Sequence, residues 1–257
     1  CGATDDDVRS VPHHGYHVVD PRTRYDAGRF VDDANRCIAD IATRGKTPIL
    51  VGGTGLYLRS LRFGLGDVPG ASQDVREALR AQLERVGVLA LHAQLAKIDP
   101  IGGLRISPRD TVRIVRALEI VAVTGQTPSQ LRQSHWHRPP QVQANWFLLL
   151  ADMSWLEDRI CVRVAQMFDD CLVAEALALR DHVGLENDLL DTMGYREALA
   201  LADGTSSRRQ AADAIGLRQR QYAKRQRTWF RKETWWQTLP AASPDSAMTQ
   251  ILKIVGA

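Results

Sequence analysis

Basic and aromatic side chains are interleaved in one stretch near the C-terminus, residues 217–232 (LRQRQYAKRQRTWFRK). Seven of the fifteen residues from Arg218 to Lys232 are basic and none is acidic. Four of the basic residues are spaced by four, three and four positions, as on one face of a helix: Arg220, Lys224, Arg227 and Arg231. The pattern suits a phosphodiester backbone and stacked bases, although a solvated surface helix would carry similar charges. We interpret it as an RNA-binding helix.

A glycine-rich turn, GGTG at residues 52–55, follows the apolar run 49–51 and precedes an amphipathic helical pattern. A strand, a glycine turn and a helix in that order direct backbone N–H groups at a phosphate. The turn lacks the lysine of a Walker A loop. RGKT at 44–47 imitates the end of such a loop, but Asp40 stands where its first glycine belongs. The order of elements is also wrong for that loop, which argues against a small-molecule kinase.

Two arginines one helical turn apart, Arg159 and Arg163, are candidates for clamping a diphosphate through paired hydrogen bonds. Pairing with the neighbouring acids Glu157 and Asp158 is the structural alternative. The seven histidines form no recognisable catalytic dyad, and the four cysteines have no metal-binding spacing. The sequence therefore predicts reduced thiols and no metal site made by this chain.

The amino-acid composition restricts the class of protein only broadly. The chain has 257 residues, of which 44% are hydrophobic and 25% charged, and its formal net charge is +3. These values are typical of a globular protein, and the small net charge does not by itself indicate nucleic acid. No apolar run is long enough to span a bilayer and no signal peptide is recognisable, so we expect a cytoplasmic protein without a membrane partner.

The secondary-structure pattern positions these candidates. Strands are expected at 15–20, 48–51 and 144–152, with helices over about 29–45 and 55–62, which favours an α/β core with a parallel sheet. Four helical segments lie between the second and third strands: 73–87, 89–97, 108–124 and 128–134. Ser107 and Pro108 suggest the start of the third of them. Ser154 to Glu157 reads as a capping box that opens one helix to about residue 182. We thus predict a core of residues 1–66 and 144–257, interrupted by a helical insertion at 67–143.

Five motifs in this order resemble the tRNA dimethylallyltransferase (tRNA isopentenyltransferase) family: VPHH at 11–14, GKTPILVGGTGLYLRSL at 45–61, RALE at 116–119, MGYREAL at 193–199 and YAKRQRTWFR at 222–231. The resemblance implies transfer of a dimethylallyl group from dimethylallyl diphosphate to N6 of the adenosine 3′ of the tRNA anticodon, with the base flipped out. It also implies a core like that of P-loop NTPases with a helical insertion, Mg²⁺ as cofactor, and a monomer.

The resemblance assigns roles to individual residues. Thr54 matches a position near the reacting centre that also contacts tRNA, and Arg159 and Arg163 match arginines near the diphosphate. The other positions that match tRNA contacts are Arg76, Val112, Arg113, Ile114, Val115, Arg116, Gly194, Tyr195, Arg196, Lys224, Arg225, Gln226, Arg227, Thr228, Trp229, Phe230 and Arg231.

Family members begin with a strand, a phosphate loop and a helix, followed by a strand that carries an Asp as the presumed base. None of these precedes Cys1-Gly2-Ala3-Thr4, so on the order of 40 residues, one βαβ-sized unit, are expected to be missing. We accordingly expect this chain alone to be inactive or impaired. Two alternatives stay open: an adenylate isopentenyltransferase, which the basic helix disfavours, and a non-catalytic tRNA-binding relative.

Overall fold

The computed structural model describes residues 5–16, 18–23, 25–65, 72–135, 139–185, 187–241 and 243–256. It divides into two compact units, Cys1–Leu58 with Gln143–Ala257, and Arg59–Val142. Among the residues it describes, no helix is long and apolar enough to cross a membrane.

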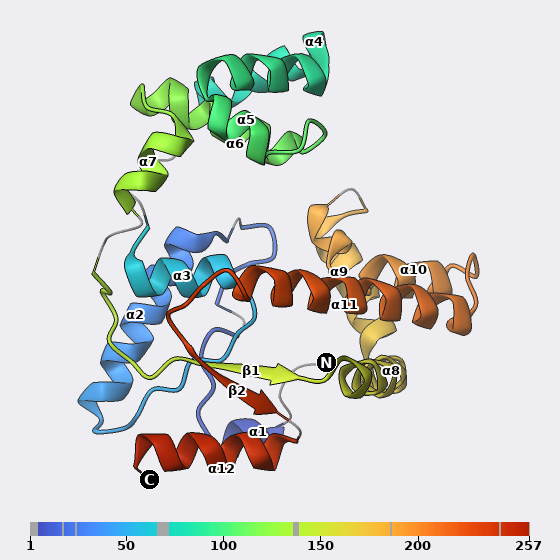
Figure 1. Ribbon diagram of the computed structural model, residues 1–257. Helices are drawn as coiled ribbons and strands as arrows, with labels where there is room; N and C mark the ends of the chain where they lie inside the picture. The colour runs from blue at the N-terminus through green and yellow to red at the C-terminus, as the bar shows by residue number, and fades with distance from the viewer. Residues whose placement is uncertain are drawn as a thin grey trace. The chain divides into compact units, whose positions relative to one another are not determined.

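The first unit contains a two-stranded parallel sheet, β1 (Phe147–Ala151) and β2 (Gln237–Ala241). Leu149 lies opposite Leu239 at the centre of the register, and α12 (Pro244–Val255) packs beside β2 (Figure 1). The rings of Trp146 and Trp235, which precede the two strands, meet edge to face with centroids 5.0 Å apart. The strand expected at 144–152 is confirmed as β1 and its pairing is parallel, as expected, but its partner β2 was not expected from the sequence.

A helical layer makes up the rest of the unit's C-terminal half. Its elements are α8 (Met153–Asp170), α9 (Leu172–Val183), the 3₁₀ helix η1 (Asp188–Asp191), α10 (Tyr195–Ala202) and α11 (Arg208–Phe230) (Figure 1). One apolar core joins all of them: Ile160, Val164, Leu172, Ala176, Leu190, Ala198, Leu199 and Ile215. This core holds the basic helix α11 in place, so the position of its charges is set by burial of small apolar side chains on its other face.

The N-terminal part of this unit contains α1 (Asp5–Ser10), α2 (Ala27–Thr43) and the start of α3 (Gly55–Phe63). Asp26 caps α2 by accepting hydrogen bonds from the N–H groups of Gly28 and Arg29, at 3.0 and 3.1 Å. The ring of Phe30 stacks on that of Tyr57 with centroids 4.8 Å apart, which fastens α2 to the helix after the glycine turn. Both helices are confirmed.

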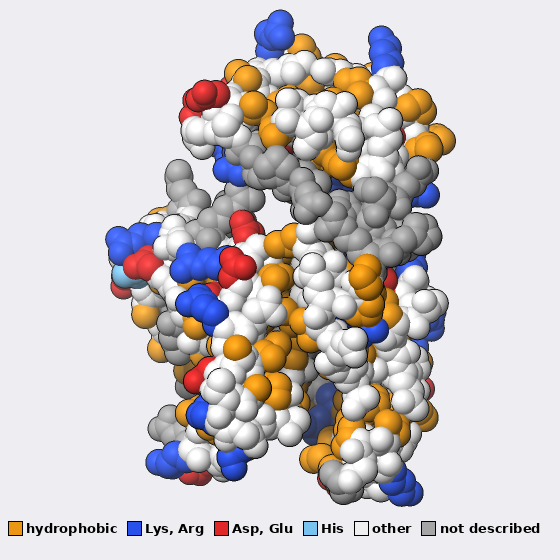
Figure 2. Space-filling view, turned by 90° about the vertical axis from the view of Figure 1, so that its left-hand side faces the viewer, with side chains coloured by type: hydrophobic (Ala, Val, Ile, Leu, Met, Phe, Trp, Pro, Cys, Tyr) orange, Lys and Arg blue, Asp and Glu red, His pale blue; other side chains and the backbone are white. Residues whose placement is uncertain are grey.

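Two expected strands are wrong. Residues 15–20 and 48–51 have no strand structure at any position that the structure describes. Ile49 and Val51 are 81% and 88% exposed, and hydrophobic side chains reach the surface on the face shown in Figure 2. A parallel strand needs a paired neighbour and cover on both faces. Within the described part of the chain neither segment has a strand beside it, so a favourable sequence pattern does not become a strand.

The second unit is helical and contains α4 (Gln73–Ile98), α5 (Pro100–Arg105), α6 (Thr111–Thr124) and α7 (Pro128–His135). Its core joins α4 to α6 through Leu79, Leu91, Leu95, Ile114, Ala117 and Leu118. The break expected near residue 88 is present as a kink in α4 at Gly87, whose φ of 78° suits glycine. The short helix α5 was not expected.

Two predicted helix starts need correction. Asp110, not Ser107, caps α6 and accepts a hydrogen bond from the N–H of Arg113 at 3.1 Å. Asp152, not Ser154, caps α8, and hydrogen bonds from Ser154 lower the pKa of its carboxyl. A carboxylate accepts from the exposed N–H groups of a helix at least as well as a hydroxyl does, so the nearby Asp prevails in both places. The helix expected to reach residue 182 also stops at Asp170, because Cys171 leaves helical geometry.

Candidate nucleic-acid and diphosphate site

The glycine turn lies directly against the C-terminal half of α11. The side-chain Nε2 of Gln226 donates a hydrogen bond to the carbonyl of Gly53 at 3.0 Å. A Cβ added to Gly53 would overlap the Gln226 amide, and one added to Gly55 would overlap the Trp229 ring. Gly55 is therefore required by close approach to the Trp229 ring, whereas at Gly53 the flexible Gln226 side chain would have to move. Thr54 between them is exposed and accepts the first hydrogen bonds of α3 through its carbonyl.

The predicted basic face of α11 is only partly open. Lys224 and Arg231 are exposed, but Arg231 follows the last helical residue as the C-cap. Arg227 is half-buried and its Nη1 donates to the carbonyl of Ala151 at 3.1 Å, so it fastens the helix to the end of β1. Arg220 is half-buried as well. The face therefore combines exposed cations with cations that hold the fold together.

The remaining predicted positions of this segment also differ in exposure. Arg225 is exposed and its guanidinium lies 5.8 Å from the Tyr222 ring centroid, and Thr228 is exposed. Trp229 is half-buried, whereas Phe230 is 7% exposed and packs against Trp236 with ring centroids 4.7 Å apart. The side chain of Phe230 is thus part of the core and is not available to stack on a base.

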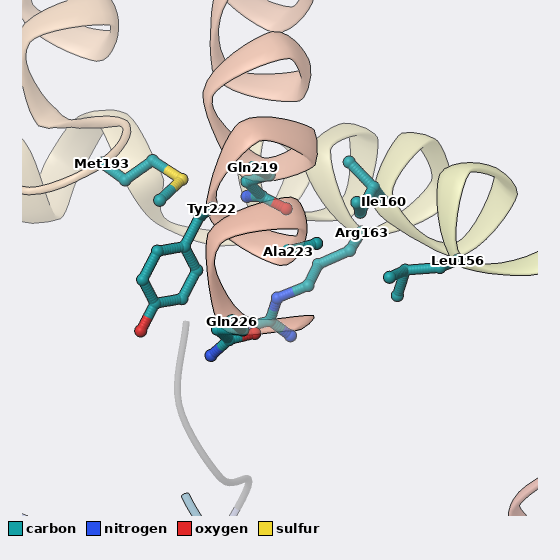
Figure 3. Close-up of a pocket in the computed structure, with 8 residues that line it drawn as sticks. All are labelled: Leu156, Ile160, Arg163, Met193, Gln219, Tyr222, Ala223 and Gln226. Carbon is teal, nitrogen blue, oxygen red and sulfur yellow. The ribbon is translucent and has the colours of Figure 1, made fainter. Parts of the chain in front are cut away.

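A pocket of about 310 Å³ opens between α8 and α11 (Figure 3). Its lining is apolar apart from one guanidinium, two amides and a phenol: Leu156, Ile160, Arg163, Met193, Gln219, Tyr222, Ala223 and Gln226. Figure 3 shows Arg163 extending from α8 toward Gln226 of α11. The same Gln226 bonds the glycine turn, so the pocket and the turn share a wall. A small ligand with an apolar part and an anionic part fits this chemistry.

The structure separates the two arginines that were predicted to act together. Arg163 lines the pocket, whereas Arg159 lies outside its lining with its guanidinium 5.9 Å from the Trp155 ring centroid. Both side chains are exposed. Residues four apart are neighbours on one helix face, but here Arg163 reaches the pocket while Arg159 lies beside Trp155. Their roles at a diphosphate stay predictions.

The predicted Gly194-Tyr195-Arg196 segment forms the start of α10. Gly194 is its N-cap with φ of 109°, a conformation that favours glycine. The hydroxyl of Tyr195 donates to Glu175 at 2.6 Å, and burial together with that bond raises the pKa of Tyr195 well above its usual value. Arg196 pairs with Asp191 and is exposed. Of the three, the Arg196 side chain is the one on the surface.

The predicted contacts in the second unit lie on α4 and α6. Val112 is 80% exposed, and Arg113 is exposed beside Asp110. Ile114 is fully buried in the core, so its side chain cannot reach a ligand. Val115 packs against that core. The arginines Arg76 and Arg116 are half-buried, and both lie beside Glu119. Whether these residues bind tRNA stays a prediction.

Sequence reasoning missed most of the pocket lining. Its members recur at helical spacing: Leu156, Ile160 and Arg163 on α8, and Gln219, Tyr222, Ala223 and Gln226 on α11. The intervals of four and three on α8, and of three, one and three on α11, each define one helix face. The charged residues of α11, on which the sequence prediction rested, define a different face of the helix. The sequence signal for the pocket was the recurrence of uncharged polar residues at helical spacing, Gln219, Tyr222 and Gln226.

The described residues contain no group of three or more His, Cys, Asp or Glu side chains that could hold a metal ion. The described residues therefore offer no cluster of three such ligands for the Mg²⁺ expected from the family resemblance.

The chain is similar in sequence to known tRNA-modifying enzymes. The family model described as IPP transferase matches residues 2–233. The tRNA dimethylallyltransferase of Anaeromyxobacter dehalogenans is 42% identical over 230 residues, which are 90% of this chain and 77% of that protein. That of Geobacter sulfurreducens is 39% identical over 253 residues, 97% of this chain and 81% of the relative.

Solved structures agree with this similarity. The full-length tRNA isopentenylpyrophosphate transferase from Bacillus halodurans has a TM-score of 0.62 and 34% identity, over 99% of this chain and 80% of that one. A eukaryotic dimethylallyltransferase acting on tRNA has a TM-score of 0.81 over 99% of this chain and 67% of its own, and at 24% identity it shows a shared fold. The expected α/β fold class is therefore confirmed.

Proposed function

Because the chain belongs to the IPP transferase family, we propose that it transfers a dimethylallyl group from dimethylallyl diphosphate to N6 of the adenosine 3′ of the anticodon in tRNA. The bond between the allylic carbon and the diphosphate oxygen breaks. A bond between that carbon and N6 forms, the amine loses a proton, and diphosphate leaves. The observation that carries the proposal is the family match over residues 2–233, combined with a pocket that pairs apolar walls with Arg163.

The pocket supplies two properties that this reaction needs. Leu156, Ile160 and Met193 offer an apolar wall for the dimethylallyl chain. The Arg163 guanidinium offsets the charge that grows on the leaving diphosphate, where a fixed cation acts more strongly than water. The amides of Gln219 and Gln226 add hydrogen-bonding groups that could orient the adenine.

The exposed cations of α11 give tRNA a place to bind beside this pocket. Lys224, Arg225 and Arg231 are exposed, and Tyr222 lines the pocket on the same helix. Phosphate contacts by such residues supply affinity without reading sequence. Thr54 is exposed on the glycine turn. It follows Gly53, whose carbonyl accepts the hydrogen bond from Gln226 of α11. We further propose that the protein acts as a monomer in the cytoplasm, where its tRNA substrate is processed, and that Mg²⁺ enters with the diphosphate.

The test is transfer by the purified protein. It is incubated with dimethylallyl diphosphate, Mg²⁺ and either unmodified tRNA or AMP, and the acceptors are digested and analysed by mass spectrometry. A dimethylallyl group on adenosine of tRNA but not on AMP supports the proposal. Transfer to AMP supports an adenylate isopentenyltransferase. Salt-dependent tRNA binding without transfer agrees both with a non-catalytic relative and with the expected inactivity of residues 1–257 alone. Absence of both binding and transfer would contradict the proposal.

Two arginine variants locate the reaction. Arg163→Ala is expected to lower kcat/KM by about 10²-fold or more, since a charge at the leaving group contributes several kcal/mol in related cases. Arg209→Ala is the matched control, because that side chain is 93% exposed on α11 and lies outside the pocket lining. Equal activity of both variants would mean that the pocket is not the reaction site.

A further inference from the structure

A buried carboxylate lies between two arginines in the second unit. Glu119 of α6 is 9% exposed. Its Oε2 accepts a hydrogen bond from Nη1 of Arg116 at 3.0 Å, and its Oε1 lies 3.9 Å from Nε of Arg76 on α4. One acid therefore joins cations from the two helices that form the core of this unit.

The exposures of the three side chains are unequal. The Glu119 side chain is 12% exposed, whereas those of Arg76 and Arg116 are 34% and 43% exposed. Each guanidinium has five N–H donors in a rigid plane, so pairing with one carboxylate leaves donors that point elsewhere. The carboxylate is thus on the most buried of the three side chains, and both arginine side chains are more accessible to solvent.

Glu119 is an acidic residue in a unit whose net charge is positive. Residues 59–142 contain twelve Lys and Arg against seven Asp and Glu, a net +5, while the rest of the chain contains 21 against 23, a net −2. A basic surface attracts a polyanion such as RNA, and an acid within it opposes that attraction. If Glu119 only added negative charge, removing it would strengthen RNA binding.

We propose that Glu119 is a positioning residue, which fixes Arg76 and Arg116 so that their free donors meet two phosphates of the bound tRNA. This inference rests on the proposed function, because it concerns the same substrate. A fixed guanidinium loses less conformational entropy on binding than a free one. In the free protein Glu119 restrains Arg116 through a hydrogen bond and Arg76 through an ion pair at 3.9 Å.

The experiment compares Glu119→Gln with Glu84→Gln. Glu84 is an exposed acid of α4 in the same unit, so both variants remove one negative charge of the same side-chain length. Binding of unmodified tRNA is measured at several salt concentrations, and transfer kinetics are recorded with tRNA as the varied substrate. Positioning predicts about three- to tenfold weaker tRNA binding for Glu119→Gln, a salt slope lower by about 1, and a raised KM for tRNA with kcat unchanged. Glu84→Gln should bind equally well or more tightly.

A second comparison separates positioning from damage to the fold. In an Arg76→Ala/Arg116→Ala background the same Glu119→Gln change should have no further effect on affinity, because the side chains that it acts through are gone. Glu119→Asp, which keeps the carboxylate, should retain most of the affinity. If Glu119→Gln binds tRNA as well as the parent or better, or if its effect persists in the double variant, the inference is overturned. Failure of the parent protein to bind tRNA would instead overturn the proposed function, and this inference with it.

Discussion

Gln226 and Gly53 are 173 positions apart in the chain and are joined by a hydrogen bond of 3.0 Å. This contact makes one wall from two motifs that the sequence presents separately, the glycine turn and the basic helix α11. Gln226 also lines the pocket with Arg163. A substitution that moves the turn would therefore shift Gln226 and change the shape of the pocket. Gly55 of the turn thus serves packing against α11.

Gly55→Ala is expected to destabilise the protein by about 1–3 kcal/mol, because the new methyl group would overlap the Trp229 ring and push α11 outward. Urea unfolding followed by tryptophan fluorescence measures the loss of stability. Gly52→Ala is the matched control, since a Cβ there would lie 3.7 Å from Leu58 Cδ2, an ordinary contact. Equal destabilisation of the two variants would contradict the packing explanation.

Asp99→Ala is expected to cost about 2–4 kcal/mol of unfolding free energy. Asp99 is 2% exposed, and its two carboxylate oxygens accept from Gly102 N at 2.9 Å and Ser129 N at 3.1 Å, at the starts of α5 and α7. Its loss leaves two buried N–H groups without an acceptor. Thermal or urea unfolding provides the measurement.

Asp110→Ala is the comparison for that variant, because Asp110 caps α6 alone and is half-buried. Its cost should be nearer to about 1 kcal/mol. Asp99→Asn should fall between the two, since an amide has one acceptor oxygen where the carboxylate has two. A cost for Asp99→Ala no larger than that for Asp110→Ala would show that the double cap contributes nothing extra.

Lys224→Ala should weaken tRNA binding by about two- to fivefold at moderate salt and reduce the slope of log K against log salt concentration by about 1. The side chain is exposed on α11 and would release one counterion fewer after the change. Lys253→Ala, an exposed lysine near the end of α12, removes the same charge from another helix. Filter binding over a salt series distinguishes the two, and identical slopes would leave Lys224 without a phosphate contact.

Stability should fall as the pH rises above about 10, the usual pKa of tyrosine, and Tyr195 should contribute to the fall. Burial and the hydrogen bond to Glu175 raise the pKa of Tyr195 in the folded state. The unfolded chain therefore loses this proton first, and the folded state loses stability until the pH passes its own higher pKa. Below pH 10 the group is protonated in both states and adds no pH dependence.

The measurement is urea unfolding at pH 8 and at pH 10.5 for the parent protein and Tyr195→Phe. The variant should lose less stability between the two pH values, although Tyr25 and Tyr57, whose pKa values are also raised, keep part of the dependence. Tyr16→Phe is the control, because that side chain is 55% exposed. An unchanged difference in Tyr195→Phe would mean that its ionisation is not coupled to folding.

Local pattern determined much of this protein from the sequence alone. The helices α2, α3 and α7, the kink at Gly87 and the strand β1 follow from apolar periodicity and from where glycine and proline stand, which are properties of neighbouring residues. The order of motifs along the chain was likewise sufficient to assign the family. VGGTGLY and AKRQRTWFR identify it although the sequence does not show how far apart they lie in space.

Tertiary structure alone decided which partner each side chain meets. Ile49 and Val51 have the pattern of a strand, yet a strand exists only beside another, and none lies beside them among the described residues. Arg227 and Arg231 look alike in the sequence, but the first bonds Ala151 and the second is exposed. The pocket arises where one face of α8 meets one face of α11, and that meeting is set by the burial of residues such as Ile160 and Ile215 from distant parts of the chain. Spacing along a helix specifies a face, whereas packing specifies what the face meets.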